Sequence, residues 1–394
     1  MVFLFYGGLR PRPGKIFDFV VVRVQDNGNS SELILTGFRS PFIIEYMRIR
    51  SIIILLTLLT VPCLSLAQTD SGLTYSESAR VEAVKRGLKY LTASQKPNGS
   101  FGSGYYDGDA AVTALAGMAF ISSGDVCETP DAPSSKCVKY LLSIARPDGF
   151  INRPATADAD GSFRPMYGHG FATLFLAETA GMYQGDDLIP VLDRAIKLII
   201  ASQNDEGGWR YFPVKKDADV SVTACQVMAL RAARNAGRDV PAETIDRAVK
   251  YLMARQNSDG GFMYMSPSGE SALPRSAAVV AALYSAGQND NPALEKSFDY
   301  LNGHLQKAFA QNDRRSPLPG FSEDYPYYAI YYLSGAYRQQ QKDWQAWRNR
   351  IVPVLLAAQN PDGSWSSEFS KDYATAMALI VLQLENNYLP IWQK

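Results

Sequence analysis

Residues 196–230 read IKLIIASQNDEGGWRYFPVKKDADVSVTACQVMAL, and this stretch decides the fold. Ile196 and Ile199 continue a helically spaced apolar stripe, which predicts an amphipathic helix that buries one face. The glycines at 207–208 end that helix, because glycine adopts the left-handed conformation at little cost. Asp219 then suits an N-cap, and the segment after it is apolar on nearly every side, which predicts a fully buried helix. One unit is therefore an outer helix, a glycine-aromatic turn and an inner helix.

The same unit recurs along the chain. Glutamine, a short polar stretch, glycine and an aromatic residue return at a spacing of roughly 45–60 residues, which is typical of a repeat protein. The turn aromatics are Phe101, Phe150, Trp209, Phe262, Phe321 and Trp365. About six helix pairs whose second helix cannot face water predict closure into a ring. The expected fold is therefore all-α, an (α/α)6 toroid in which outer helices surround inner ones.

These turns resemble the QW-type repeats of squalene–hopene cyclases and of protein prenyltransferase β subunits, whose fold is an α/α toroid. Three further motifs, MYGHGFAT at 166–173, GGWRY at 207–211 and YLP at 388–390, resemble a group of secreted bacterial squalene-cyclase-like proteins with a single toroid. The resemblance covers about residues 75–393. It implies the fold and leaves the activity open.

Composition sets the class of protein. The chain has 394 residues, is 46% hydrophobic and carries no net charge, which suits one domain with a large core. The balanced charge and the lack of a basic run argue against a nucleic-acid partner. Two histidines limit histidine-based catalysis and metal binding. We expect no metal and no cofactor.

Residues 47–67 have the pattern of a secretory signal peptide. Two arginines precede an apolar run at 52–59, and SLA at 65–67 precedes Gln68 as a small-residue cleavage site. We therefore expect a secreted or periplasmic protein whose toroid domain is 68–394. The run is too short to give the mature chain a stable membrane span. Residues 1–46 are interpreted as an over-extended start outside the fold; the alternative is that the apolar run is internal and acts as an uncleaved anchor.

Export changes the interpretation of the cysteines. Cys127 and Cys137 flank a loop rich in proline and serine, and an oxidising compartment favours a disulfide between them. Two free thiols are the alternative. Cys225 lies within a predicted inner helix and is most simply a small core residue.

Polar residues recur where the inner helices begin. A toroid would place all of them around one mouth of its central cavity, as ligand-binding or catalytic groups. They are Asp109, His169, Asp219, Arg275, Asp324 and Asp372. The alternative is that each aspartate only caps its own helix. His169 and Arg275 are poor caps, because positive charge is unfavourable at a helix N-terminus.

The segment DADV at 217–220 resembles the Asp-x-Asp-Asp motif of class II terpene cyclases, whose proton-donating middle aspartate falls on Asp219. Such chemistry needs a protonated, polarised carboxyl group. The third acid is Val220 here, and one toroid stands where those cyclases pair two. If this site is catalytic, Asp219 is the general acid, and His169 or Asp109 assists it. Asp217 is then expected to contact ligand.

Residues 324–335 resemble the prenyltransferase segment that carries a zinc-binding histidine, which falls on Tyr328 here. No Asp-x-Cys pair accompanies it, so a zinc-dependent prenyltransferase is not expected. Tyr327 and Tyr328 are expected to line the cavity. Trp209 has two interpretations, ligand contact or packing against the helix ends of its own repeat, and we favour packing.

Three functions fit these observations. The first is a binding module for an apolar or amphipathic ligand, isoprenoid or peptide, or an interaction platform. The second is an exported terpenoid cyclase- or prenyltransferase-like enzyme that uses Asp219. The third is a carbohydrate-active enzyme on the same fold. An enzyme of the second kind needs an aromatic-lined pocket of several hundred Å³ that converges on Asp219.

Overall fold

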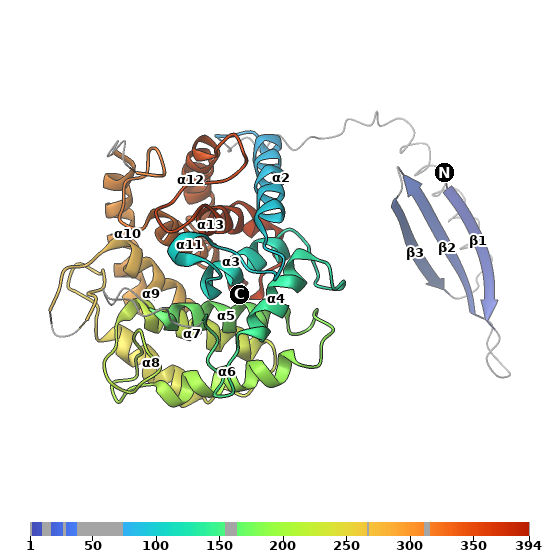
Figure 1. Cartoon of the computed structure of the whole chain (residues 1–394). Coiled ribbons are helices and arrows are strands. Elements are labelled where there is room, and N and C mark those ends of the chain that lie inside the picture. Colours follow the sequence, from blue (N-terminus) through green and yellow to red (C-terminus); the bar gives the residue numbers. More distant parts are fainter. Residues whose placement is uncertain are drawn as a thin grey trace. The chain divides into compact units, whose positions relative to one another are not determined.

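The computed structural model describes residues 2–9, 17–26, 29–37, 74–153, 164–265, 268–310 and 316–393. The chain divides into two compact units, residues 1–71 and residues 72–394 (Figure 1). The expected signal peptide at 47–67 and its cleavage site at Gln68 lie outside the described residues, so both stay predictions.

The first unit contains a sheet that the sequence analysis did not predict. Its strands are β1 (Val2–Leu9), β2 (Phe17–Asp26) and β3 (Asn29–Gly37). They pair antiparallel in the order β1-β2-β3. The β-branched residues of β2 favour this extended backbone. The sheet belongs to the unit that ends at residue 71, apart from the toroid.

Six helices form the inner ring of the second unit. They are α3 (Ala110–Ile121), α5 (Pro165–Thr179), α7 (Val220–Asn235), α9 (Leu273–Ser285), α11 (Pro326–Gln340) and α13 (Lys371–Gln383). Each packs against the next, and α13 packs against α3, which closes the ring (Figure 1). Their side chains are buried on nearly all faces, as the continuous apolar sequence predicts.

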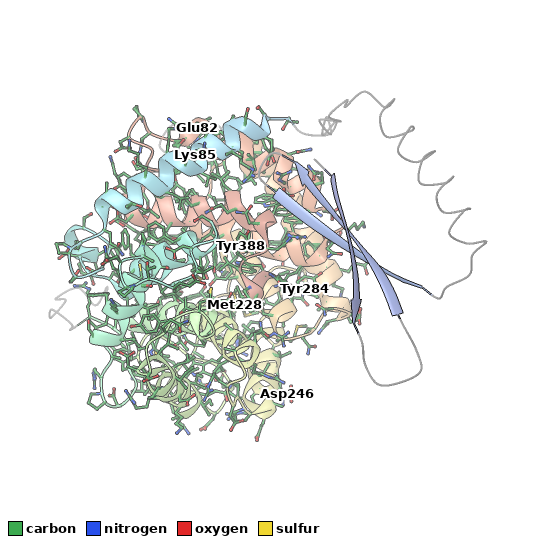
Figure 2. All side chains as sticks on the ribbon, turned by 90° about the vertical axis from the view of Figure 1, so that its right-hand side faces the viewer. Glu82, Lys85, Met228, Asp246, Tyr284 and Tyr388 are labelled. Atoms are coloured by element: carbon green, nitrogen blue, oxygen red, sulfur yellow. The ribbon has the colours of Figure 1, made fainter. Side chains whose placement is uncertain are left out.

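Six outer helices surround this ring. They are α2 (Glu77–Ser94), α4 (Pro133–Ser143), α6 (Leu188–Ser202), α8 (Ala242–Met253), α10 (Pro292–Ala310) and α12 (Trp344–Ala358). Each buries one stripe: Glu82 and Lys85 lie exposed on α2, whereas Met228 of α7 lies in the core (Figure 2). The predicted all-α toroid of six helix pairs is confirmed.

The repeated glutamines tie neighbouring outer helices together. The Gln203 side-chain amide donates to Gly207 O at 2.8 Å and to Thr244 O of α8 at 2.9 Å. Gln359 of the last repeat donates to Ala83 O of α2 at 2.9 Å, which joins the last repeat to the first. Buried carbonyl groups need such partners. In the four repeats that contain this glutamine, the same motif therefore ends the outer helix and links it to the next one.

The turn tryptophans belong to the core. Trp209 is 1% exposed, and its backbone N–H donates to Thr223 Oγ1 at 3.0 Å. Its indole N–H donates to Ile199 O at the end of α6 at 2.7 Å. Trp365 repeats both hydrogen bonds in the last unit. Each ring therefore fastens an outer helix to the inner helix of its own repeat.

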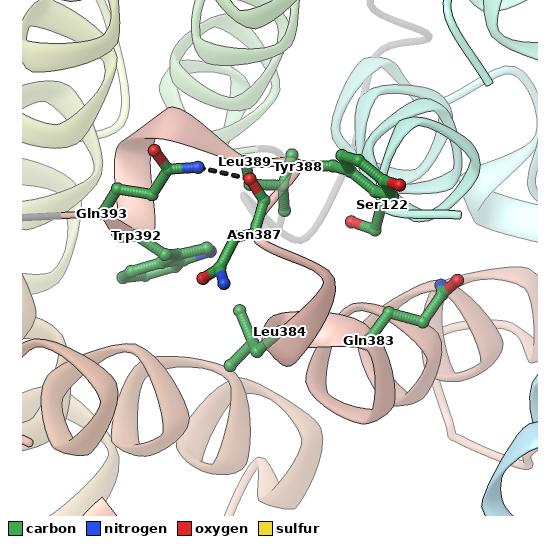
Figure 3. A pocket seen from close by; sticks show the side chains of 8 residues that line it. All are labelled: Ser122, Gln383, Leu384, Asn387, Tyr388, Leu389, Trp392 and Gln393. Carbon is green, nitrogen blue, oxygen red and sulfur yellow. Dashed lines mark hydrogen bonds between the residues drawn. The ribbon is translucent and has the colours of Figure 1, made fainter. Parts of the chain in front are cut away.

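The C-terminal segment packs across the ends of the inner helices, where Ile391 contacts Glu178 and Gln339. After η2 (Leu384–Asn386), the turn η3 (Pro390–Trp392) brings Trp392 to a small pocket that Leu384 and Asn387 also line (Figure 3). The ring of Trp392 packs against that of Tyr331, with centroids 5.2 Å apart. A Cβ atom at Gly335 would lie 2.0 Å from this indole, so only glycine fits there. We call residues 387–393 the C-terminal plug.

The expected disulfide is not formed in this structure. Cys127 and Cys137 are both free buried thiols. Cys127 Sγ lies 3.0 Å from Ser134 Oγ, and Cys137 Sγ lies 3.5 Å from the side-chain amide of Gln95. Burial raises the pKa of Cys127 to about 11, and it raises the pKa of Cys137 as well. Each sulfur thus has its own polar neighbour in this structure, and the disulfide stays a prediction.

Candidate functional site

A cavity of about 820 Å³ opens where the inner helices begin. Its wall is apolar on α3, α5 and α13, where Val112, Leu115, Phe171 and Met377 line it. Tyrosines add further lining: Tyr106, Tyr167, Tyr211, Tyr264, Tyr328 and Tyr373. The toroid is therefore hollow at this mouth and not filled by its own side chains.

The rim of the cavity carries charge of both signs. The charged residues that line it are Asp109, Arg153, Arg164, Arg275, Glu323, Asp324 and Glu368. Of the residues predicted for the mouth, the structure brings Asp109, Arg275, Asp324 and Tyr328 together here. Sequence reasoning missed Arg164, Glu323 and Glu368, because they lie in turns of unequal length that a repeat alignment does not bring into register.

Asp219 lies directly behind this wall. Its carboxylate caps α7 by accepting from the backbone N–H of Val222 at 2.8 Å, and the Tyr264 hydroxyl donates to it at 3.3 Å. Tyr264 and Ser221 line the cavity, whereas Asp219 itself is fully buried. Burial raises the pKa of Asp219 to about 6, against the lowering effect of its hydrogen bonds and of Arg210. A carboxyl group of this kind holds a proton more firmly than an exposed aspartate does.

Hydroxyl groups connect Asp219 to the cavity. The hydroxyl of Tyr211 contacts that of Tyr264, which in turn reaches Asp219. The guanidinium of Arg164 lies over the Tyr211 ring at 4.8 Å from its centroid. Burial, followed by the nearby Asp219 carboxylate, raises the pKa of Tyr264, so this phenol donates hydrogen bonds and keeps its proton. The arrangement forms a hydrogen-bonded path from the cavity to a buried acid.

Asp109 and Glu323 are acids in the cavity wall itself. Asp109 caps α3 by accepting from the backbone N–H groups of Ala111 and Val112. Burial raises the pKa of Asp109 in spite of those bonds. Burial and the neighbouring Asp324 raise the pKa of Glu323 to about 7. Both carboxyl groups therefore sit in surroundings that disfavour their charge.

His169 lies away from the cavity. It is fully buried, its Nδ1 accepts from the backbone N–H of Ile151 at 3.1 Å, and its Nε2 lies 3.2 Å from Ala195 O. Burial lowers the pKa of His169 to about 4, so the ring is neutral. In four other repeats a threonine or serine hydroxyl accepts from the corresponding turn N–H, as Thr223 does. His169 therefore takes the place of that hydroxyl group and fastens its own turn.

Four further predicted site residues also lie outside the cavity wall. Asp217 pairs with Arg210 at 2.6 Å, and Asp372 accepts from the backbone N–H of Gly102 at 2.8 Å. Trp209 is held in the core of its repeat, as described above. Tyr327 is 1% exposed, because the 100° step of the helix turns it away when Tyr328 faces the cavity.

The described ranges offer neither a metal site nor a membrane-spanning helix. These residues contain no group of three His, Cys, Asp or Glu side chains that could hold a metal ion. Within the same ranges, no helix has both the length and the apolar character needed to cross a bilayer. The second histidine, His304, packs on Tyr300 of the outer helix α10. Neither histidine of the chain lines the cavity.

The model of the prenyltransferase alpha-alpha toroid domain matches residues 64–263 and 159–310. The chain belongs to this family. Among curated proteins, drimenyl diphosphate synthase from Streptomyces showdoensis is 30% identical over 187 residues. The match covers 46% of this toroid protein and 32% of the synthase, so the chain spans about a third of that relative's length.

Solved structures of several activities share the toroid. The type II terpene cyclase MstE from Scytonema matches with a TM-score of 0.52 and 17% identity, over 80% of this chain and 100% of that one. A D-mannose isomerase matches with a TM-score of 0.55 and 12% identity, over 79% and 100% of the two chains. A family 76 glycoside hydrolase from a Bacteroides thetaiotaomicron strain matches with a TM-score of 0.56 and 10% identity, over 95% of this chain and 85% of that one. At such identities these likenesses show the fold alone.

Proposed function

We propose that this toroid protein is exported and that its cavity binds an apolar or amphipathic ligand of the isoprenoid type. The cavity of about 820 Å³ carries the proposal, since ligand sites commonly have about 300–1,000 Å³. Its inner wall is apolar and aromatic, and its rim is charged. Such a site buries an apolar body and leaves a polar head at the mouth.

Two observations favour an isoprenoid body over a carbohydrate. Leu115, Phe171 and Met377 present hydrocarbon to the ligand, and a sugar hydroxyl placed there would lose its hydrogen bonds to water without replacement. The relative with 30% identity is named as a drimenyl diphosphate synthase, so the likeness favours a terpenoid body. The carbohydrate-active neighbours share the fold at 10–12% identity.

Filling the cavity should remove the ligand. Ala111 lies in the first turn of α3 and lines the cavity, so Ala111→Trp places an indole in the binding space. We expect farnesol to bind at least about tenfold more weakly to this variant, a loss of about 1.4 kcal/mol, by titration calorimetry. Lipid extraction and mass spectrometry of the exported wild-type protein should recover an isoprenoid that the variant lacks, and intact-mass measurement should place the N-terminus at Gln68.

The matched control is Ala357→Trp on the exposed side of α12. This change adds the same indole at a residue that does not line the cavity, so farnesol binding and the extracted lipid should be unchanged. Equal binding by wild type and Ala111→Trp would contradict a ligand site in the cavity.

Proton donation by Asp219 is the second candidate function. The observation that favours it is the hydrogen-bonded path from the cavity through Tyr264 to a buried carboxyl group whose pKa is raised to about 6. A cyclase that starts by protonating an alkene needs an acid held away from water. Asp219 would act in this way once the Tyr264 side chain moves aside and lets the substrate reach the carboxyl group.

Asp219→Asn separates capping from acid chemistry. Asparagine caps helices nearly as well as aspartate but has no proton to donate as an acid. If Asp219 is the acid, cyclisation of a polyprenyl substrate should disappear while the melting temperature and the binding of farnesol persist. Asp219→Ala provides the control for capping and should cost about 1 kcal/mol of stability. Undiminished cyclisation by the Asn variant, measured by gas chromatography of the products, would exclude this role.

A further inference from the structure

We infer that one side of the cavity mouth is a subsite for an organic ammonium group, so that the ligand is an apolar molecule with a cationic head. The inference rests on the proposed function, because it assigns the head group of a ligand whose body fills the same cavity. The subsite lies where the turns before α11, α13 and α3 meet, and these three helices are neighbours in the inner ring. We call it the ammonium subsite.

Aromatic rings form the frame of the ammonium subsite. Phe369 lies at its centre: its ring is stacked with that of Tyr325 at 6.0 Å between centroids. Tyr106 and Tyr373 meet Phe369 edge to face at 5.5 and 5.2 Å. All four rings line the cavity. Clusters of aromatic rings bind ammonium groups through the negative faces of the rings, and quaternary ammonium ligands are commonly recognised in this way.

Carboxylates surround the same rings. Glu323, Asp324 and Glu368 line the cavity from the turns before α11 and α13, and none of them forms an ion pair with another described residue. Two lysines of this region are engaged elsewhere, Lys96 with Asp107 and Lys371 with Asp362. Besides burial, Asp109, Tyr105 and Glu368 raise the pKa of Tyr106, whereas Arg164 lowers it. This half of the mouth therefore attracts a cation.

An unsatisfied acceptor provides independent support for a ligand. Asn152 lines the cavity beside α3 and is 5% exposed. Its amide donates to Pro165 O at 2.8 Å, whereas its Oδ1 has no hydrogen-bond partner among the described residues. A buried acceptor without a partner is costly, and a donor on a bound ligand would satisfy it once the Asn152 side chain rotates toward the cavity.

The arginines of the mouth lie on its other side. Arg164 precedes α5 and covers the ring of Tyr211, and Arg275 begins α9, where its guanidinium donates to Phe262 O at 3.0 Å. Arg153 lies over the ring of Tyr105 at 5.2 Å, at the border between the two halves. Arg164 and Arg275 are thus apart from Phe369 in the order of the ring. Arg153 lies nearer, because the Tyr105 ring that it covers meets Tyr106 edge to face at 5.0 Å. An ammonium head is favoured on the aromatic side and disfavoured near these arginines.

The test compares alkyl probes that differ only in the head group. Dodecyltrimethylammonium, dodecyl tri(ethylene glycol) and dodecyl sulfate are titrated into the full-length protein below their micelle-forming concentrations, with calorimetric detection. We expect the ammonium probe to bind about five- to thirtyfold more tightly than the neutral probe, the range that cation–π contacts of about 1–2 kcal/mol provide. The sulfate probe should bind more weakly than both.

Two variants test whether Phe369 and Glu368 contact the ammonium head. Phe369→Leu removes the central ring and Glu368→Gln removes one charge; each should weaken the ammonium probe at least about threefold and leave the neutral probe within a factor of two. Tyr388→Leu, which changes an exposed ring on the C-terminal plug, is the control and should alter neither probe. Should Phe369→Leu fail to fold, Glu368→Gln and the wild-type probe series still decide the question.

The outcomes separate the two proposals. Equal binding of the ammonium and neutral probes, or preference for the sulfate, overturns the ammonium subsite and leaves the apolar cavity intact. If no probe binds wild type more tightly than it binds Ala111→Trp, the proposed ligand-binding function itself fails, and the ammonium subsite with it.

Discussion

Replacing Trp209 by alanine should lower the free energy of unfolding by about 3–5 kcal/mol. The side chain is 1% exposed, and its indole N–H donates to Ile199 O at 2.7 Å, so truncation leaves a large void and removes a buried hydrogen bond. Chemical denaturation followed by circular dichroism measures the loss. Ligand affinity should be retained under conditions where the variant is folded, because Trp209 does not line the cavity.

Trp209→Phe is the graded control. The phenyl ring fills most of the space but cannot donate to Ile199. We therefore expect a smaller loss in the free energy of unfolding, of which the missing hydrogen bond contributes about 1 kcal/mol. A Trp209→Ala variant with wild-type stability and altered ligand binding would show that the ring contacts ligand, the interpretation that the geometry disfavours.

Glu178→Gln should make the toroid more stable at alkaline pH. Glu178 lies on α5 beside the C-terminal plug, where its carboxyl group accepts from the backbone N–H of Ile391 at 3.4 Å. Burial raises the pKa of Glu178 from 4.5 to about 8. The folded protein therefore holds a proton that the unfolded chain releases above about pH 4.5. Stability is full below that pH, falls as pH rises toward 8 and then levels off, with a total loss on the order of 5 kcal/mol.

Glutamine keeps the acceptor for Ile391 but does not ionise, so the variant should lack this part of the pH dependence. Urea denaturation at pH 5 and pH 9 gives the comparison: wild type and Glu178→Gln should differ little at pH 5 and by several kcal/mol at pH 9. Glu82→Gln, on the exposed face of α2, should follow wild type at both values. Parallel profiles for wild type and Glu178→Gln would mean that Glu178 ionises in the folded protein without cost.

Much of the fold and part of the site could be predicted from the sequence. The spacing of the turn aromatics implied six repeats, and the all-apolar segments after Asp109 and Asp219 implied an inner ring, because such helices cannot face water. The alignment of the inner-helix starts also identified Arg275 and Asp324 as residues of the mouth. These features follow from local periodicity and from capping chemistry, which a sequence displays directly.

The direction in which each polar side chain points, and the depth to which it is buried, were decided only by the tertiary structure. His169 stands in the predicted position, yet its ring turns away from the cavity toward Ile151, because that buried N–H requires an acceptor. Glu368 and Phe369 reach the mouth from a turn, whose path depends on the helices that it joins. Gly335 and Trp392 are 57 residues apart in sequence and meet only because the chain end folds back into the ring. Periodicity fixes which face of a helix is buried, but the partner of a buried polar group, and the space left between helices, depend on residues that are distant in sequence.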